Sequence, residues 1–316
     1  MTKPYNDLLP LPLDSRAEPF MTLYYNALHE LVCFGTHMVV WNLEQGKGRE
    51  NERNEISLAP VLLFRHILEL LDAISVQVKV GIVVPCKVQL RAMLEAYMSL
   101  EYMLEKDRNR RAACFLLVDH YRKLNFFKRL SHNTPESKKL FSDLSEYGEH
   151  FKNITPIEGL DQAHKNQESL IQQPIYTEAR KDYLTRTNQN AKNLDIKWYA
   201  LFDGPTSVKW LATKLKKYDI YEFFYKSWSD PTHGTNLSSK VIVRGEEGTG
   251  AIVQLRNMEE AHEIVNHAIT FTLLIFDLVA RKVVSEHKKE YATWFFEYRD
   301  KFRIPADQNK IVFNKS

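Results

Sequence analysis

Apolar residues recur at steps of three and four through long segments of this chain, and this spacing constrains the fold more than any other feature. One such stripe consists of Phe20, Leu23, Tyr24, Ala27, Leu28, Leu31 and Phe34. Residues at this spacing share one face of an α-helix. Only 11 glycines and 12 prolines interrupt the 316 residues. The pattern therefore predicts an all-α fold, with 44% hydrophobic residues to fill a large core.

Breaks in the apolar pattern predict four helices with the short connections of an antiparallel bundle. The first helix begins near Ser15, and the second follows Ser57. Gly81 separates the second from the third, which spans about 85–105, and the fourth covers about 110–130. Of these, we expect the second, third and fourth helices to form the bundle together with the last long helix of the chain.

The rest of the chain predicts a further long helix and a small insertion. The helix begins near Asn257 and continues to about His287. Two short β-branched runs around the glycine-rich segment 244–250 predict a small β-hairpin or an ordered loop. We therefore expect a single helical domain over residues 1–316. Its parts are an N-terminal helix (14–55), bundle helices (56–132), a polar insertion (133–206), a motif segment with the last long helix (207–288) and a C-terminal tail (289–316).

Charge and cysteine content exclude several classes of protein. The 43 basic and 40 acidic residues leave a net charge of only +3, so binding to nucleic acid requires a local basic patch. Cys33, Cys86 and Cys114 lack the paired spacing of a metal knuckle or a disulfide framework. Residues 1–13 lack the basic start and apolar run of a signal peptide, and the apolar stretch 264–280 is short for a membrane span. We expect a cytoplasmic protein with no membrane contact.

Ser229 and His233 lie four residues apart at the end of an aromatic segment that begins at Tyr221. The predicted helix stops at Asp230-Pro231. A hydroxyl group at this spacing can fix the tautomer of a partly exposed histidine, as a catalytic site requires. The alternative is structural: Ser229 caps the turn, and His233 satisfies a buried carbonyl group.

Arg91 and Glu95 have the i, i+4 spacing of a helical ion pair, and they lie next to the apolar stripe of the third predicted helix. Arg65 and Glu69 repeat this spacing on the second helix. Because an isolated buried charge is costly, a pair beside the stripe must be buried together. We expect Arg91 and Glu95 to form a buried polar cluster that includes His233, with purely structural pairing as the alternative to catalysis.

Two segments resemble a bacterial domain-of-unknown-function family, number 5677. They are residues 91–97, with the sequence Arg-Ala-Met-Leu-Glu-Ala-Tyr, and the segment from Tyr225 through Ser229 to His233-Gly234. The resemblance covers about residues 56–285. It implies a helical bundle similar in style to the HEPN nucleotide-binding domains, without an established reaction.

HEPN ribonucleases carry an arginine, a polar residue after it and a histidine four to six positions later. Arg256 and His262 match this spacing at the start of the last long helix, with Asn257 as the polar residue. In such a site His262 would take the proton of a 2′-hydroxyl group and Arg256 would stabilise the phosphorane, ideally twice across a dimer. The alternative is chance spacing in a helical protein, and Glu259 and Glu260 would repel a phosphate group unless they face away.

Metal and cofactor motifs do not occur in the sequence. His262 and His267 are one residue too far apart for the HExxH pair of zinc proteases. The single Glu-x-x-His pair is half of what a di-iron bundle needs. No Walker or Rossmann glycine motif occurs. We therefore expect neither a metal ion nor a cofactor.

Two basic segments provide local patches. The first interleaves Tyr121, Phe126 and Phe127 with the basic residues Arg108, Arg110, Arg111, Arg122, Lys123, Lys128 and Arg129. The second consists of Lys209, Lys214, Lys216 and Lys217. A basic helical face with aromatic residues can hold an RNA backbone. The alternative is the solvated side of a helix.

These patterns support two main hypotheses about function. The first is a HEPN-like, metal-independent ribonuclease or toxin-type effector in phage defence, which acts on RNA as a homo-oligomer. Its catalytic residues are Arg256 and His262, or His233 with Arg91, Glu95 and Ser229. The second is a non-catalytic module that binds a ligand or a protein partner in the same polar pocket. A structural subunit within a defence or regulatory operon is a third.

Overall fold

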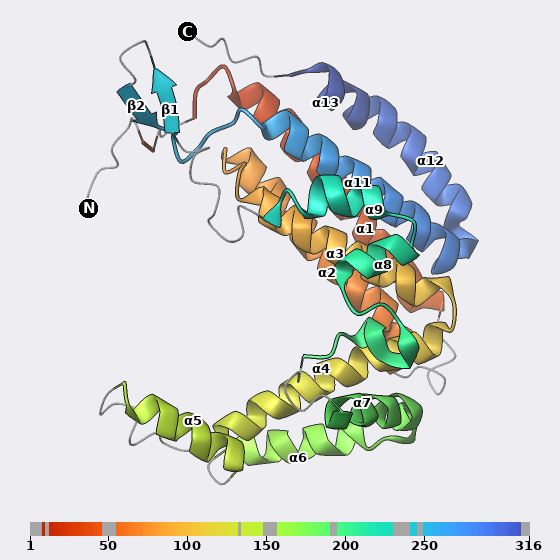
Figure 1. Cartoon of the computed structure of the whole chain (residues 1–316). Coiled ribbons are helices and arrows are strands. Elements are labelled where there is room, and N and C mark those ends of the chain that lie inside the picture. The colour runs from red at the N-terminus through yellow and green to blue at the C-terminus, as the bar shows by residue number, and fades with distance from the viewer. Residues whose placement is uncertain are drawn as a thin grey trace. The chain divides into compact units, whose positions relative to one another are not determined.

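A computed structural model describes residues 8–9, 13–45, 55–131, 134–147, 157–189, 195–229, 241–244 and 249–310. Helices make up most of these residues, which confirms the all-α prediction (Figure 1). The chain divides into two compact units, where the sequence pattern predicts one domain. Unit 1 contains Met1–Arg53, Pro60–Leu104 and Ala212–Ser316, and unit 2 contains Asn54–Ala59 and Glu105–Leu211.

Unit 1 is built mainly from long helices. They are α1 (Glu18–Gln45), α2 (Glu55–Lys79), α3 (Cys86–Glu105), α11 (Ala261–Lys282) and α12 (Lys288–Tyr298); the start of α2 as far as Ala59 and the last residue of α3 belong to unit 2. Shorter elements are α8 (Val208–Lys214), which begins in unit 2, α9 (Tyr218–Ile220), the π-helix η5 (Tyr221–Tyr225), η7 (Ser285–His287), the π-helix η8 (Arg299–Arg303) and α13 (Ile304–Gln308). The predicted break between the second and third helices occurs at Gly81, whose φ of +76° suits glycine.

Helix α11 forms the centre of unit 1. Its side chains at Ile269, Ile275 and Phe276 are fully buried, and the helix packs along α1. Among the described helices, α11 alone is long and apolar enough to cross a membrane, and 61% of its most apolar window is buried inside the protein. That burial fits the core helix that the sequence predicts here.

Aromatic rings join α11 to three other helices. Phe276 contacts Phe34 of α1 at 5.9 Å between ring centroids and Phe64 of α2 at 5.8 Å. Phe34 also stacks on Trp294 of α12, with centroids 3.8 Å apart. Gly35 lies where α1 meets α2, because a Cβ atom there would collide with Leu68. This aromatic cluster joins helices from the first and last thirds of the chain in one core.

The segment 289–316, which the sequence pattern treats as a C-terminal tail, is helical as far as Gln308. Its helices contact α1 and α11. The physical reason is a set of aromatic residues at helical spacing: Tyr291, Trp294, Phe295, Tyr298 and Phe302. Tyr298 is 1% exposed, so this helical segment is part of the core.

Unit 2 is organised around one helix, α4 (Arg108–Leu130), whose neighbours are short. They are α5 (Pro135–Ser145), α6 (Leu160–Ile171), η3 (Pro174–Tyr176), α7 (Thr177–Gln189) and η4 (Trp198–Asp203), and all of them contact α4. The predicted polar insertion, 133–206, therefore contains most of this unit. A few buried residues among many polar ones, including Ile171, Tyr176 and Tyr183, are enough to fix its helices.

Two short strands, β1 (Val241–Arg244) and β2 (Thr249–Ile252), pair antiparallel in unit 1. Val241 is opposite Ile252, and Arg244 is opposite Thr249. The residues between the strands, 245–248, lie outside the described part of the chain.

We expect Phe276→Ala to lower the free energy of unfolding by about 3–5 kcal/mol, because it removes a buried ring and leaves a cavity. Leu274→Ala is the matched control on the same helix, since Leu274 is 42% exposed, and its effect should stay within roughly 0.5 kcal/mol. Urea denaturation followed by circular dichroism measures both. Equal losses in the two variants would contradict the central place of α11.

Candidate functional site

The candidate site lies on one face of α3 in unit 1. Lys87, Arg91 and Glu95 follow one another at steps of four residues, so their side chains share a face of the helix. The apolar neighbours Leu90 and Leu94 are fully buried and anchor the helix beside them. The charged face meets the aromatic segment of η5 and the residues that follow it.

Arg91 binds two side chains of this aromatic segment. Its Nε atom donates a hydrogen bond to Ser229 Oγ at 3.0 Å, and its Nη2 atom donates to the Tyr225 hydroxyl at 2.8 Å. The guanidinium group also lies 4.4 Å from the centre of the Tyr225 ring. The arginine is therefore fixed by neutral groups.

Tyr225 connects Arg91 to Glu95. Its hydroxyl donates to Glu95 Oε2 at 3.1 Å, while Ser229 Oγ donates to the backbone carbonyl of Tyr225 at 3.0 Å. Tyr225 is 7% exposed. We call these four residues (Arg91, Glu95, Tyr225 and Ser229) the Arg91 cluster. Arg91 and Glu95, which the sequence places in one cluster, therefore share it with Ser229, and their charges are joined through a phenol rather than directly.

The π-helix η5 (Tyr221–Tyr225) sets the geometry of this cluster. Its wider turn is closed by a hydrogen bond from the Lys226 amide to the Tyr221 carbonyl, 3.0 Å long. Single π-turns in helices occur often at functional sites. Sequence reasoning predicts an ordinary helix here and does not assign Tyr225 a role. The signal that identifies it is its position four residues before Ser229.

Helix α11 packs against the aromatic segment. The His267 ring contacts Phe224 at 4.9 Å and Trp228 at 5.5 Å between centroids. Burial lowers the pKa of His267 from its usual value of 6.5; Glu263 opposes this shift, and Lys87 adds to it. Lys87 also forms an ion pair of 2.8 Å with Glu260, which precedes α11. These contacts hold η5 between α3 and α11.

His262 lies in a different hydrogen-bond network. The Tyr24 hydroxyl donates to the Asn309 carbonyl at 2.8 Å and lies 3.2 Å from His262 Nδ1. Asn266 Nδ2 lies 2.9 Å from His262 Nε2. Because the tyrosine proton is used, Nδ1–H donates to Tyr24 and Nε2 accepts from Asn266. Both ring nitrogens of a neutral His262 are thus engaged in tying α1, α11 and the C-terminal segment together.

Arg256 does not join His262. The Arg256 Cβ atom lies beside Gly81, 3.6 Å from where a Cβ atom on that glycine would lie. Among the described residues, no hydrogen bond or ion pair links Arg256 to His262, or either of them to the Arg91 cluster. His233 lies outside the described residues. The structure therefore brings together three of the six candidate residues: Arg91, Glu95 and Ser229.

The chain is similar to a known family over part of its length. The model of a family of unknown function (DUF5677) matches residues 58–249, more than half of the chain. The chain belongs to this family. The matched region contains the whole Arg91 cluster and ends before Arg256 and His262. No curated protein and no solved structure matches the chain.

We expect His262→Gln to weaken the pH dependence of stability. Burial lowers the pKa of His262 below 6.5, Lys310 adds to this shift, and Asp307 opposes it. The unfolded chain therefore binds the proton more readily, so stability is full above about pH 6.5 and is lost as the pH falls through the lowered pKa. The loss between pH 8 and pH 5 should be smaller in the variant, although His267 keeps part of it. Thermal unfolding at several pH values measures this.

The control for this prediction is His66→Gln. The His66 side chain is 53% exposed on α2, so its removal leaves the buried network intact. The prediction fails if His262→Gln and wild type lose stability in parallel.

Proposed function

We propose that unit 1 binds a phosphate group of an RNA ligand at the Arg91 cluster. The observation that carries the proposal is that Arg91 is positioned by two hydroxyl groups and not by a carboxylate. No described carboxylate lies within ion-pairing distance of Arg91, since Glu95 reaches it only through Tyr225. A half-buried guanidinium group held in this way keeps its positive charge available to an anion.

The geometry of arginine favours phosphate as that anion. A guanidinium group has five N–H donors, and two of them are used by Ser229 and Tyr225. The remaining donors have no acceptor among the described residues, and their planar fork matches a phosphate group. Ser229 positions the guanidinium group but adds no further donor, because its hydroxyl proton already goes to the Tyr225 carbonyl. The cluster is thus prepared for one oxyanion.

The ribonuclease hypothesis uses the same cluster. His233 follows Ser229 by four residues, and Ser229 contacts Arg91. We therefore propose His233 as the base that acts beside Arg91. In this mechanism His233 takes the 2′-hydroxyl proton, the 2′-oxygen attacks phosphorus, and the bond from phosphorus to the 5′-oxygen breaks as that oxygen takes up a proton from water. Arg91 stabilises the charge of the phosphorane. The products are a 2′,3′-cyclic phosphate and a 5′-hydroxyl end.

We expect Arg91→Ala to weaken binding of a fluorescein-labelled single-stranded RNA roughly ten- to hundredfold, as loss of a charged hydrogen-bond donor implies. Arg91→Lys keeps the charge without the fork and should recover only part of the affinity. Fluorescence anisotropy at low salt measures both variants.

Arg65→Ala is the matched control for binding. Arg65 forms an exposed ion pair with Glu69 at 2.8 Å on α2, so its loss should leave binding unchanged. Unchanged binding by folded Arg91→Ala, or an equal loss in Arg65→Ala, would refute the proposed phosphate site.

For the ribonuclease hypothesis, we expect wild type to cleave RNA in EDTA, because the proposed mechanism needs no metal ion. His233→Ala should abolish cleavage with little change in binding, whereas His262→Ala should still cleave. Denaturing gels that resolve cyclic-phosphate products measure the reaction. RNA left intact by wild type removes the catalytic hypothesis and leaves the binding module.

A further inference from the structure

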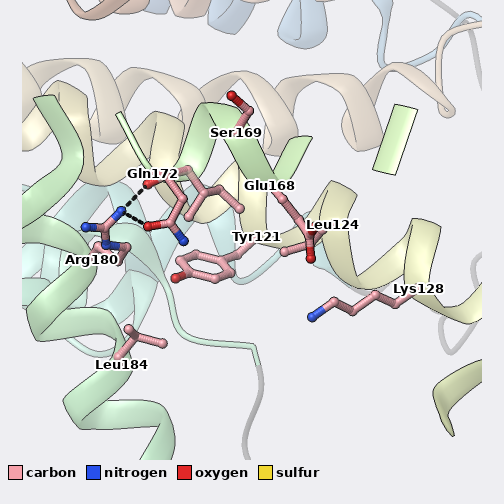
Figure 2. Close-up of a pocket in the computed structure, with 9 residues that line it drawn as sticks. Tyr121, Leu124, Lys128, Glu168, Ser169, Gln172, Arg180 and Leu184 are labelled. Carbon is pink, nitrogen blue, oxygen red and sulfur yellow. Dashed lines mark hydrogen bonds between the residues drawn. The ribbon is translucent and has the colours of Figure 1, made fainter. Parts of the chain in front are cut away.

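Unit 2 contains an open pocket of about 600 Å³ between α4, α6 and α7 (Figure 2). Its volume lies in the range of small-molecule sites. Leu124 of α4 and Ile171 of α6 contribute apolar walls, and both are buried. The pocket and the Arg91 cluster lie in different units and share no residue, so the pocket can be assessed independently of the proposed function.

One aromatic ring provides a flat surface in this pocket. The ring of Tyr121 stacks on Tyr183 of α7, with centroids 4.2 Å apart and planes 9° from parallel. Tyr183 is 4% exposed and does not line the pocket. One face of Tyr121 is therefore covered, while its ring lies in the pocket in Figure 2. A planar ligand can stack on a tyrosine fixed in this way.

Two cations flank the Tyr121 ring. Arg180 donates through Nη1 to the Ile171 carbonyl at 2.9 Å and to Gln172 Oε1 at 2.6 Å, and Lys128 lies at the other end of the pocket (Figure 2). Neither cation forms an ion pair with a described carboxylate. Glu168, the one acidic residue of the lining, lies 3.5 Å from His164 instead.

The rest of the basic face of α4 is largely neutralised. Arg110 pairs with Asp107, Arg111 with Glu105, Arg122 with Asp195, and Lys123 with Asp119. The sequence pattern leaves two interpretations of this run open, an RNA-binding face and the solvated side of a helix. Arg108 and Arg129 also lack a described ion-pair partner but do not line the pocket, so Lys128 is the unpaired cation of this run that lies in the pocket with the stacked Tyr121.

We infer that this pocket binds a nucleotide, with the base stacked on Tyr121 and the phosphate group held by Lys128 or Arg180. The Gln172 amide lies where it can contact a base edge. The nucleotide has two sources with the same chemistry, a free mononucleotide or an unpaired residue of single-stranded RNA. Double-stranded RNA does not fit, because its bases are stacked on one another and cannot stack on a protein ring.

The test uses the full chain with three probes. Equilibrium dialysis measures binding of radiolabelled AMP and UMP, and anisotropy measures binding of a labelled ten-residue oligouridine, alone or paired with oligoadenosine. We expect Tyr121→Leu to weaken binding roughly tenfold, the scale of one lost base–aromatic stack. Lys128→Ala should weaken it and reduce its dependence on salt.

Matched variants distinguish this site from general charge attraction and from the Arg91 cluster. Lys123→Ala removes a cation of the same helix that is already paired, and it should bind like wild type. Arg91→Ala should keep mononucleotide binding, whatever happens to RNA binding in unit 1. Binding of the oligonucleotide without the mononucleotides, weakened by Lys128→Ala even when Arg91 is also replaced by alanine, assigns the pocket to single-stranded RNA. Binding of both kinds of probe assigns it to nucleotides in general.

Three results overturn the inference. The first is that wild type binds no single-stranded probe. The second is that Lys123→Ala and Lys128→Ala lose equal affinity for the probes, and the third is that wild type binds paired and unpaired RNA with equal affinity. Lys128→Ala alters a partly exposed side chain, so it keeps the test decisive if Tyr121→Leu fails to fold.

Discussion

The burial of α11 is the constraint on which unit 1 depends. One part of the helix places Phe276 among the aromatic rings of α1, α2 and α12. Another part places His267 and Phe271 under Phe224 and Trp228. The same helix therefore holds the core and supports the π-turn that presents Tyr225 and Ser229. Because protein interiors are closely packed, a shift of α11 changes both.

The Arg91 cluster differs from an ordinary helical ion pair in the group that stands between the charges. Arg91 and Glu95 have the spacing to pair directly, yet each one binds the Tyr225 hydroxyl instead. A direct pair would satisfy the arginine with a full negative charge. A phenol satisfies one donor without neutralising the charge, and the phosphate site proposed above rests on this difference. Tyr225, to which the sequence pattern assigns no role, thus determines the chemistry of the cluster.

Much of the fold is predictable from the sequence because long apolar stripes specify helices and Gly81 specifies a break. The second unit is less predictable, since Ile171, Tyr176 and Tyr183 are isolated apolar residues among polar ones, and only their packing on α4 reveals a core. The C-terminal helices could have been found from aromatic spacing after Tyr291. The cost of burying a charge predicts that Arg91 and Glu95 gather in one polar cluster, but it does not predict that Ser229 and Tyr225 join them. The separate network of His262 was not, because Tyr24 and Asn309 are distant in sequence and carry no local signal.

The Arg91 cluster also sets a requirement on how the chain folds. Arg91 and Ser229 are 138 positions apart, and the continuous part of unit 2 lies between them. Bringing the two ends of so long a loop together costs conformational entropy, and the cost falls if the intervening chain is already compact. Early formation of the α4 unit would therefore shorten the effective loop. The inserted unit would then act as an entropic aid to the assembly of a site to which it contributes no side chain.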